Sequence, residues 1–146
     1  MASPMAATES NDAEHIVALV PALNRSGEIG DTVRALAGIG AIDRILVVDD
    51  GSSDDTSTVA RAAGADVLVL PTNRGKGGAI AAGVAATPDA TVYVLIDADL
   101  ATTAGAAEVL LDPVLRDDAD LTIGVLPPAE GKGGFGAVKN LAARGI

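Results

Sequence analysis

The stretch TVYVLIDADL, residues 91–100, joins a strand pattern to two closely spaced acidic residues. Its apolar run is typical of a strand buried on both faces of a parallel sheet. Asp97 and Asp99 follow at once, and two like charges at a buried strand end are costly without a positive charge nearby. Because paired carboxylates favour hard divalent cations, the stretch predicts Mg²⁺ or Mn²⁺ at Asp97 and Asp99. The alternative is that Asp99 caps the next helix and Asp97 is merely solvated, but the position at a strand end favours the cation.

Four further apolar runs resemble this one, and patterns with helical spacing lie between them. The repeated order of strand and helix indicates βαβ units and therefore an α/β fold with a mainly parallel sheet. The expected strands are 16–20, 44–48, 66–70, 91–96 and 120–125. The expected helices are 27–40, 56–64, 79–87, 102–117 with a kink or break at Pro113, and 135–146. Gly40 and Gly64 are the expected helix stops.

Polar loops follow the first four strands. They are PALNRSG (21–27), DDGSSDD (49–55), PTNRGKGG (71–78) and DADLAT (97–102). Right-handed crossovers bring these loops to one edge of the sheet, which is where open α/β sheets bind ligands. The loops at the opposite edge carry no comparable set of polar residues. This asymmetry predicts a site at the carboxyl ends of the strands.

Two of these loops carry further candidate residues. Asp50 ends a strand and is placed to accept a hydrogen bond from a ribose hydroxyl or a base N–H, while Gly51 permits a tight turn and Ser52 is a good helix cap. Lys76 lies among glycines in NRGKGGA, a segment whose backbone N–H groups suit a phosphate. The loop is neither a Walker A motif nor a dinucleotide fingerprint, because the glycine spacings differ. The missing fingerprint disfavours a dehydrogenase.

Composition narrows the classes of function. The chain has 146 residues, no cysteine and a net charge of −10. The acidic balance argues against nucleic acid as a partner. Residues 1–14 form an expected disordered tail without the features of a secretory signal, and no apolar run is long enough to span a bilayer. Residues 15–146 form the expected domain.

The order and spacing of four segments resemble glycosyltransferase family 2 and its relatives with a GT-A fold. The segments are IVALVPALN, ILVVDDGSSDDT, NRGKGGAIAAG and VLIDADL, and the resemblance covers roughly residues 16–125. It implies a Rossmann-like nucleotide-diphospho-sugar transferase fold. It also implies metal-dependent transfer of a sugar from a UDP- or GDP-sugar to an acceptor, with inversion. The acceptors found among such relatives are polyprenyl phosphates and small sugar acids.

The resemblance also implies a role for each matching position. The backbone of Pro21, Ala22, Leu23 and Asn24 would line the nucleoside, and Asp50, in its turn with Gly51 and Ser52, would contact the base. Lys76 would approach the base or the phosphates. Asp97 would contact the ribose or the water shell of the metal, and Asp99 would ligate the metal directly.

Two departures from the family pattern matter. Arg25 stands where the family commonly has glutamate, which affects one nucleotide contact and the preference for a base. The family's catalytic domains also continue past the fifth strand, so we expect this chain to hold the donor-binding half, with the general base beyond residue 146. We expect a cytoplasmic protein, peripheral at the membrane in a longer form.

Two other readings stay open. One is a non-catalytic nucleotide-binding module that self-associates into a homo-oligomer through an exposed sheet edge. The other is a sugar nucleotidyltransferase, which is disfavoured because its glycine-rich loop should follow the first strand.

Overall fold

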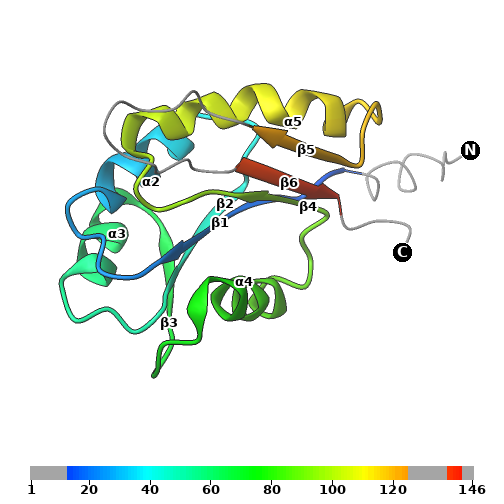
Figure 1. Cartoon of the computed structure of the whole chain (residues 1–146). Coiled ribbons are helices and arrows are strands. Elements are labelled where there is room, and N and C mark those ends of the chain that lie inside the picture. The colour runs from blue at the N-terminus through cyan, green and yellow to red at the C-terminus, as the bar shows by residue number, and fades with distance from the viewer. Residues whose placement is uncertain (1–12, 125–137, 143–146) are drawn as a thin grey trace, which may run out of the picture.

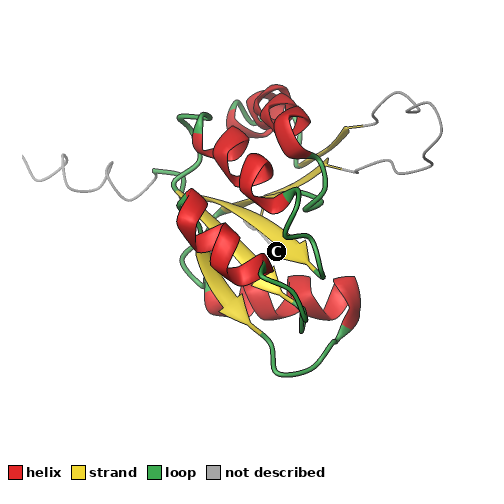
Figure 2. Ribbon diagram, turned by 90° about the vertical axis from the view of Figure 1, so that its left-hand side faces the viewer, coloured by secondary structure: helices red, strands yellow, loops and turns green. Residues whose placement is uncertain are grey.

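The computed structural model describes residues 13–124 and 138–142. These residues form one sheet with helices on both faces (Figures 1 and 2). The strands are β1 (Ile16–Ala22), β2 (Arg44–Asp49), β3 (Asp66–Val69), β4 (Val92–Leu95), β5 (Leu121–Gly124) and β6 (Val138–Ala142). The helices are α2 (Ile29–Ala37), α3 (Thr56–Ala63), α4 (Gly75–Ala86) and α5 (Ala107–Leu115), with a 3₁₀ helix, η2, at Ala101–Ala106.

The order of the strands places a switch point beside β1. The order is β3-β2-β1-β4-β6-β5, so the chain moves from β1 to one side and then returns to add β4 on the other. The first four strands pair in parallel, and β6 pairs antiparallel with both β4 and β5. The predicted mainly parallel α/β sheet is thus confirmed, and the carboxyl ends of β1 and β4 diverge into separate loops.

Alternation along the central strands fills two cores. Ala18 and Val20 of β1 point toward α2, α3 and α5, whereas Val17 and Leu19 point toward α4. Figure 1 shows α4 alone on its side of the sheet. Gly83 brings α4 close to β1, because a Cβ at this position would lie 2.7 Å from Leu19 Cδ2. The cores consist almost entirely of Val, Leu, Ile and Ala, as the scarcity of aromatic residues requires.

Four predicted elements differ from the structure. The expected helix at 135–146 is wrong, because residues 138–142 form β6, which pairs on both sides within the sheet. The expected glycine-rich loop is shorter than predicted, because α4 begins at Gly75. Pro113 lies inside α5, which ends two residues later, and α2 is capped at Gly38 rather than Gly40.

The predicted helix stop at Gly64 agrees with the structure. Gly64 ends α3 in the left-handed conformation with φ 110°, as a C-terminal glycine should. Glu14, the last residue of the predicted tail, accepts a hydrogen bond of 2.7 Å from the Thr91 hydroxyl and so contacts the domain. Residues 1–12 of the predicted tail lie outside the described residues. Within the described part of the chain, no helix is both long and apolar enough to cross a membrane.

Candidate functional site

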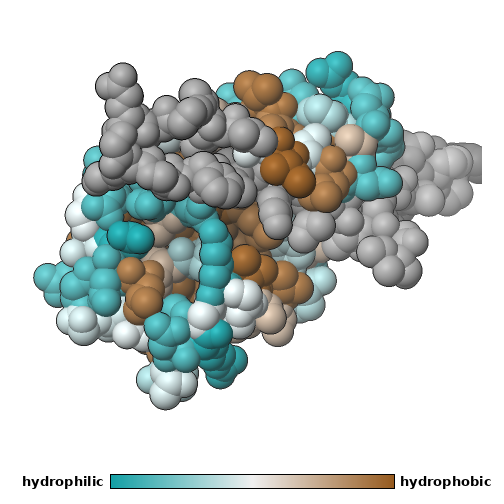
Figure 3. Space-filling model, in the orientation of Figure 1, coloured by the Kyte–Doolittle hydropathy of each residue, from teal (hydrophilic) through white to brown (hydrophobic). Residues whose placement is uncertain are grey.

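A cleft of about 400 Å³ lies at the carboxyl ends of β1, β2 and β4. It is lined by the loops after these strands and by the first turn of α4. On the face drawn in Figure 3, hydrophilic side chains gather over this loop edge. The lining residues are Pro21, Ala22, Leu23, Arg25, Asp50, Asn73, Gly75, Lys76, Asp97, Ala98 and Asp99.

Most of the predicted site residues line this cleft. The structure brings together Pro21, Ala22, Leu23, Asp50, Lys76, Asp97 and Asp99, which come from four separate segments of the chain. The structure therefore has a cleft at the edge of the sheet where the polar loops predicted a site.

Three predicted residues are not part of the cleft lining and instead shape its loops. Asn24 has φ 54°, its N–H donates to Ser52 Oγ at 2.8 Å, and its side-chain oxygen accepts from the N–H of Ser53 at 2.8 Å. Gly51 has φ 85°, and a Cβ there would lie 3.2 Å from the backbone nitrogen of Asn73. These contacts tie the loop after β1 to the loops after β2 and β3.

Asp50 is a buried carboxylate fixed from two directions. Its N–H donates to the carbonyl of Ala22 at 2.9 Å, and its Oδ1 accepts from the N–H of Arg74 at 2.7 Å. Its other oxygen accepts no hydrogen bond from the residues that the structure describes. Since Asp50 lines the cleft, that oxygen is available to an N–H or O–H group of a ligand.

Asp97 and Asp99 lie at the opposite wall, after β4. Asp97 forms an ion pair with the Lys76 ammonium group from the first turn of α4. Asp99 is exposed and has no ion-pair partner among residues 13–124. The positive charge that the sequence required beside Asp97 is thus supplied, in part, by Lys76.

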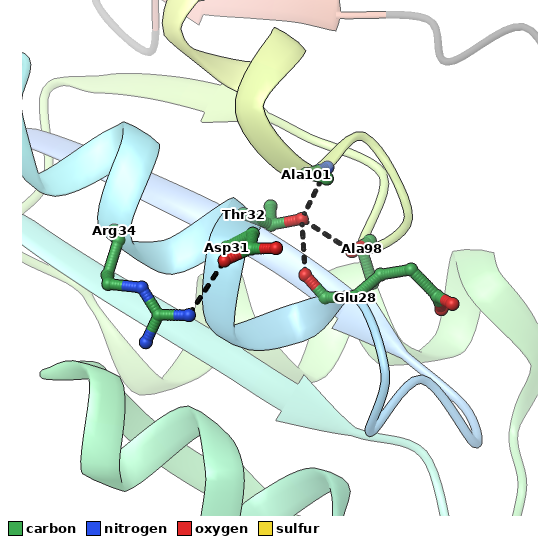
Figure 4. A network of polar contacts seen from close by, with 6 residues as sticks. All are labelled: Glu28, Asp31, Thr32, Arg34, Ala98 and Ala101. Carbon is green, nitrogen blue, oxygen red and sulfur yellow. Dashed lines mark hydrogen bonds and ion pairs between the residues drawn. The ribbon is translucent and has the colours of Figure 1, made fainter.

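A buried threonine holds the turn that carries these carboxylates (Figure 4). The hydroxyl of Thr32, in α2, donates to the carbonyl of Ala98 at 2.7 Å and accepts from the N–H of Ala101 at 2.8 Å. It also contacts the carbonyl of Glu28 at 3.1 Å. Ala101 has φ 51°, an unfavourable value for a residue with a Cβ, so this hydrogen bond supports a strained turn.

The donor set at this wall fits a divalent cation that is only partly enclosed by protein. Asp97 and Asp99 offer hard oxygen ligands, and both line the cleft. No group of three or more acidic, histidine or cysteine side chains that would hold a metal occurs in the described part of the chain. Mg²⁺ commonly keeps only one or two carboxylates and takes its other ligands from water and phosphate, so two aspartates are sufficient.

Four residues of the lining were not among the predicted contacts: Arg25, Asn73, Gly75 and Ala98. Asn73 Oδ1 accepts from the N–H of Gly75 at 2.8 Å, which forms an Asx turn just before α4. An asparagine close to glycine is a turn signal that the sequence contained. In the sequence, Arg25 is distinguished only by its departure from the family pattern.

A second cavity of about 310 Å³ adjoins the first and shares Pro21, Lys76 and Asp97 with it. Its other lining residues are Gly77, Ile80, Leu95 and Ile96. It is therefore more apolar than the first cavity, and it opens between α4 and β4.

Asp54 lies in the loop after β2, on the same side of the cleft as Asp50. The hydrogen bond from the Thr56 hydroxyl, with further bonds from the N–H groups of Thr56 and Ser26, lowers the pKa of Asp54 to about 2. Asp54 therefore stays ionised at any physiological pH and anchors the backbone at Ser26 through a bond of 3.2 Å.

This combination of fold and site defines a class. A parallel sheet with a switch point, a loop-lined cleft and an Asp-x-Asp turn at the end of β4 is the GT-A architecture of nucleotide-sugar transferases, as the sequence predicted. The sequence profile of glycosyl transferase family 2 matches residues 17–142. The chain belongs to this family.

Curated relatives agree. An uncharacterized glycosyltransferase of Mycobacterium tuberculosis is 40% identical over 116 residues, which cover 80% of this chain and 50% of the relative. An uncharacterized protein of Methanocaldococcus jannaschii is 36% identical over 113 residues, which cover 76% of this chain and 46% of the relative. The chain spans about half the length of these two relatives.

A solved structure is similar over the same region. It is glucosyl-3-phosphoglycerate synthase of M. tuberculosis in complex with Mn²⁺, UDP and glucosyl-3-phosphoglycerate. It superimposes with a TM-score of 0.68 at 30% sequence identity, covering 77% of this chain and 44% of that one. The same enzyme has also been solved with Mg²⁺ and UDP, and that structure superimposes with a TM-score of 0.67.

Proposed function

We propose that this chain binds a nucleotide-diphospho-sugar in the cleft together with Mn²⁺ or Mg²⁺, and that the whole protein transfers the sugar to an acceptor with inversion. One observation carries the proposal. The fold gathers Asp50, Lys76, Asp97 and Asp99 from two loops and the first turn of α4 around one cleft at the switch point of the sheet. A nucleoside needs acceptors such as Asp50. A diphosphate needs positive charge, which Lys76 and a cation held by Asp97 and Asp99 would supply. The two walls therefore suit the two ends of one ligand.

The residues of this chain divide the work by position. Pro21, Ala22 and Leu23 offer backbone and apolar surface to the nucleoside, beside the free oxygen of Asp50. Lys76 and the N–H groups at the start of α4 face the diphosphate, because a helix N-terminus favours negative charge.

Asp97 and Asp99 would hold the metal. When bound, the metal supplies Lewis-acid stabilisation of the charge that develops on the leaving diphosphate. Lys76 would then exchange its contact with Asp97 for the phosphates.

The solved relative supports a phosphorylated small acid as the acceptor, since it was solved with its glucosylated product. The second cavity favours another candidate, a polyprenyl phosphate, because Ile80, Leu95 and Ile96 give apolar surface beside Lys76 and Asp97. Transfer assays with a longer form of the protein, offered phosphoglycerate and then a polyprenyl phosphate, separate the two candidates by which one accepts the radiolabelled sugar.

Isothermal titration calorimetry with UDP and GDP, each with Mn²⁺ and with EDTA, tests the donor site in this chain. We expect binding of at least one nucleotide that depends on Mn²⁺. Asp99→Asn should weaken the metal-dependent binding and keep the fold. Asp89→Asn makes the same charge change on an exposed loop far from the cleft and should bind normally.

Equal affinity of the Asp99→Asn and Asp89→Asn variants would remove Asp99 from the proposed metal site. Absence of binding under every condition would contradict the donor-site proposal for this chain. The reading of a non-catalytic, self-associating module would then be tested by size-exclusion chromatography with light scattering.

A further inference from the structure

Arg25 lies in the cleft on a rigid backbone. Its N–H donates to the hydroxyl of Thr56 at 2.8 Å. Its carbonyl accepts from the N–H groups of Glu28 at 3.1 Å and Ile29 at 2.9 Å, where α2 begins. The position of the Arg25 Cα is therefore set by the fold, and the side chain extends from a fixed point at the cleft wall.

The neighbouring hydrogen bonds place the Arg25 backbone beside the loop after β2. Three consecutive backbone N–H groups, those of Asn24, Arg25 and Ser26, donate to the loop after β2 and the first residue of α3. That loop begins with Asp50. Arg25 is therefore tied to the Asp50 wall, whereas Asp97 and Asp99 belong to the loop after β4.

The guanidinium group of Arg25 is not committed to the protein. It has no ion pair and no hydrogen-bond acceptor among residues 13–124. Lys76, the other cation of the lining, is paired with Asp97. The Asp50 wall therefore presents one carboxylate oxygen that accepts and one planar group that donates two parallel hydrogen bonds.

We propose that Arg25 and Asp50 together select guanine, so that the donor is a guanosine diphospho-sugar. Guanine carries its two N–H donors, N1 and N2, beside two acceptors, O6 and N7. Arginine binds the O6 and N7 pair with both arms of its guanidinium group, and this is the commonest specific contact to guanine in protein complexes with nucleic acids. Asp50 accepts from N1–H and N2–H on the neighbouring edge. This inference rests on the proposed function of the cleft.

Other bases leave part of this wall unsatisfied. Uracil gives Asp50 one N–H, at N3. Its acceptors O2 and O4 lie on opposite sides of that N–H, so they cannot pair with both arms of the Arg25 guanidinium group. Cytosine suits Arg25 but gives Asp50 one amino group only. Adenine places its amino group against the donors of Arg25. Asp50 is buried, so a base that leaves its free oxygen without a donor costs more than a missing contact, and this asymmetry makes the wall selective.

Calorimetry with GDP, UDP, CDP and ADP in the presence of Mn²⁺ tests the selection. A bidentate contact of this kind discriminates by about 1–3 kcal/mol, so GDP should bind the wild-type chain about 5- to 150-fold more tightly than UDP. Arg25→Gln should remove most of that ratio by weakening GDP. Arg61→Gln, which makes the same charge change on the exposed side of α3, should leave the ratio unchanged.

Arg25→Lys separates a contact with the base from a contact with the phosphates. Lysine keeps the charge but lacks the planar fork. If Arg25 contacts guanine, Arg25→Lys loses the selectivity for GDP over UDP. If Arg25 contacts the diphosphate, Arg25→Lys keeps the affinities for both nucleotides, and Arg25→Gln weakens binding of GDP and UDP by the same factor. This second result would overturn the inference. Thermal unfolding by circular dichroism checks that each variant is folded.

The remaining outcomes are also decisive. Wild-type binding of UDP or CDP that is as tight as binding of GDP would overturn the selection of guanine and leave the donor site intact. Binding of no nucleotide by a folded wild-type chain would overturn the proposed function, and the inference with it.

Discussion

Thr32 gives the sharpest test of how the fold positions the two aspartates. Thr32→Val keeps the shape of the side chain and removes its hydroxyl. The carbonyl of the buried Ala98 then loses its donor, and the N–H of Ala101 loses its acceptor. Leaving such groups unsatisfied costs about 1–3 kcal/mol. At roughly 2–4 °C per kcal/mol for a chain of this size, the melting temperature should fall by about 2–12 °C.

Loss of stability is only half of the expectation. The turn from Asp97 to Ala101 contains a residue at positive φ, and without Thr32 nothing in the described structure holds the N–H of that residue. We expect Mn²⁺-dependent nucleotide binding by Thr32→Val to weaken at least tenfold at 20 °C, under conditions where the variant is still folded. Thr32→Ser retains the hydroxyl and should bind within about threefold of the wild type.

Thr87→Val is the matched control. The hydroxyl of Thr87 is also buried, also contacts the carbonyl four residues earlier and also meets a second polar group, the hydroxyl of Tyr93. It lies beyond the C-terminus of α4, away from the cleft. Thr87→Val should therefore lower the melting temperature by a similar amount and leave binding unchanged. Unchanged binding in Thr32→Val, or equal losses in both variants, would refute the positioning role of Thr32.

Three further predictions concern pH, packing and charge. The folded-state pKa of Asp54, about 2, lies below its ordinary value of 3.8, so its stabilising effect is present above pH 4 and is lost as pH falls toward 2. The difference in unfolding free energy between the wild type and Asp54→Asn should shrink over that interval in urea titrations. Gly83→Ala should lower the free energy of unfolding by about 1–3 kcal/mol, because the added Cβ would collide with Leu19 of β1. Gly77→Ala meets nothing within 4 Å and should raise the free energy of unfolding by up to about 1 kcal/mol. Equal effects of the two variants in urea titrations would contradict this expectation. Lys76→Met should raise the affinity of the chain for Mn²⁺ alone by about fivefold, because the ammonium group no longer competes for Asp97. The EPR signal of free Mn²⁺ measures this affinity. An unchanged affinity would argue against a metal at Asp97.

The sequence predicted those parts of the fold whose signals are local. Buried parallel strands appear as short apolar runs, and the loops after them are polar because they line a cleft. These two patterns predict the edge of the sheet at which the structure has a cleft, and most of the residues that line it. The same reasoning missed the start of α4, because glycine has a low helix propensity and three glycines stand in its first turn.

Non-local pairing explains the wrong prediction at residues 135–146. Alanine, leucine and lysine favour a helix in isolation, but Val138–Ala142 pairs between β4 and β5. Strand formation here depends on partners that are distant in sequence, and tertiary context overrides local propensity. The role of Thr32 was hidden for the same reason, since its partner Ala98 lies 66 residues away.

The segment that joins β1 to α2 connects the two walls of the cleft. At one end, the carbonyl of Ala22 binds the N–H of Asp50, on the wall that we assign to the base. At the other end, Thr32 binds the backbone of Ala98, between the two carboxylates that we assign to the metal. The separation of base and diphosphate in the ligand must match the separation of these two walls. This segment bonds to both walls, and so does the start of α4, through Arg74 to Asp50 and Lys76 to Asp97. Substitutions in the segment from β1 to α2 should therefore change the affinities for nucleotide and metal together. Substitutions at Asp50 should mainly change the affinity for the nucleotide, and substitutions at Asp99 should mainly change the affinity for the metal.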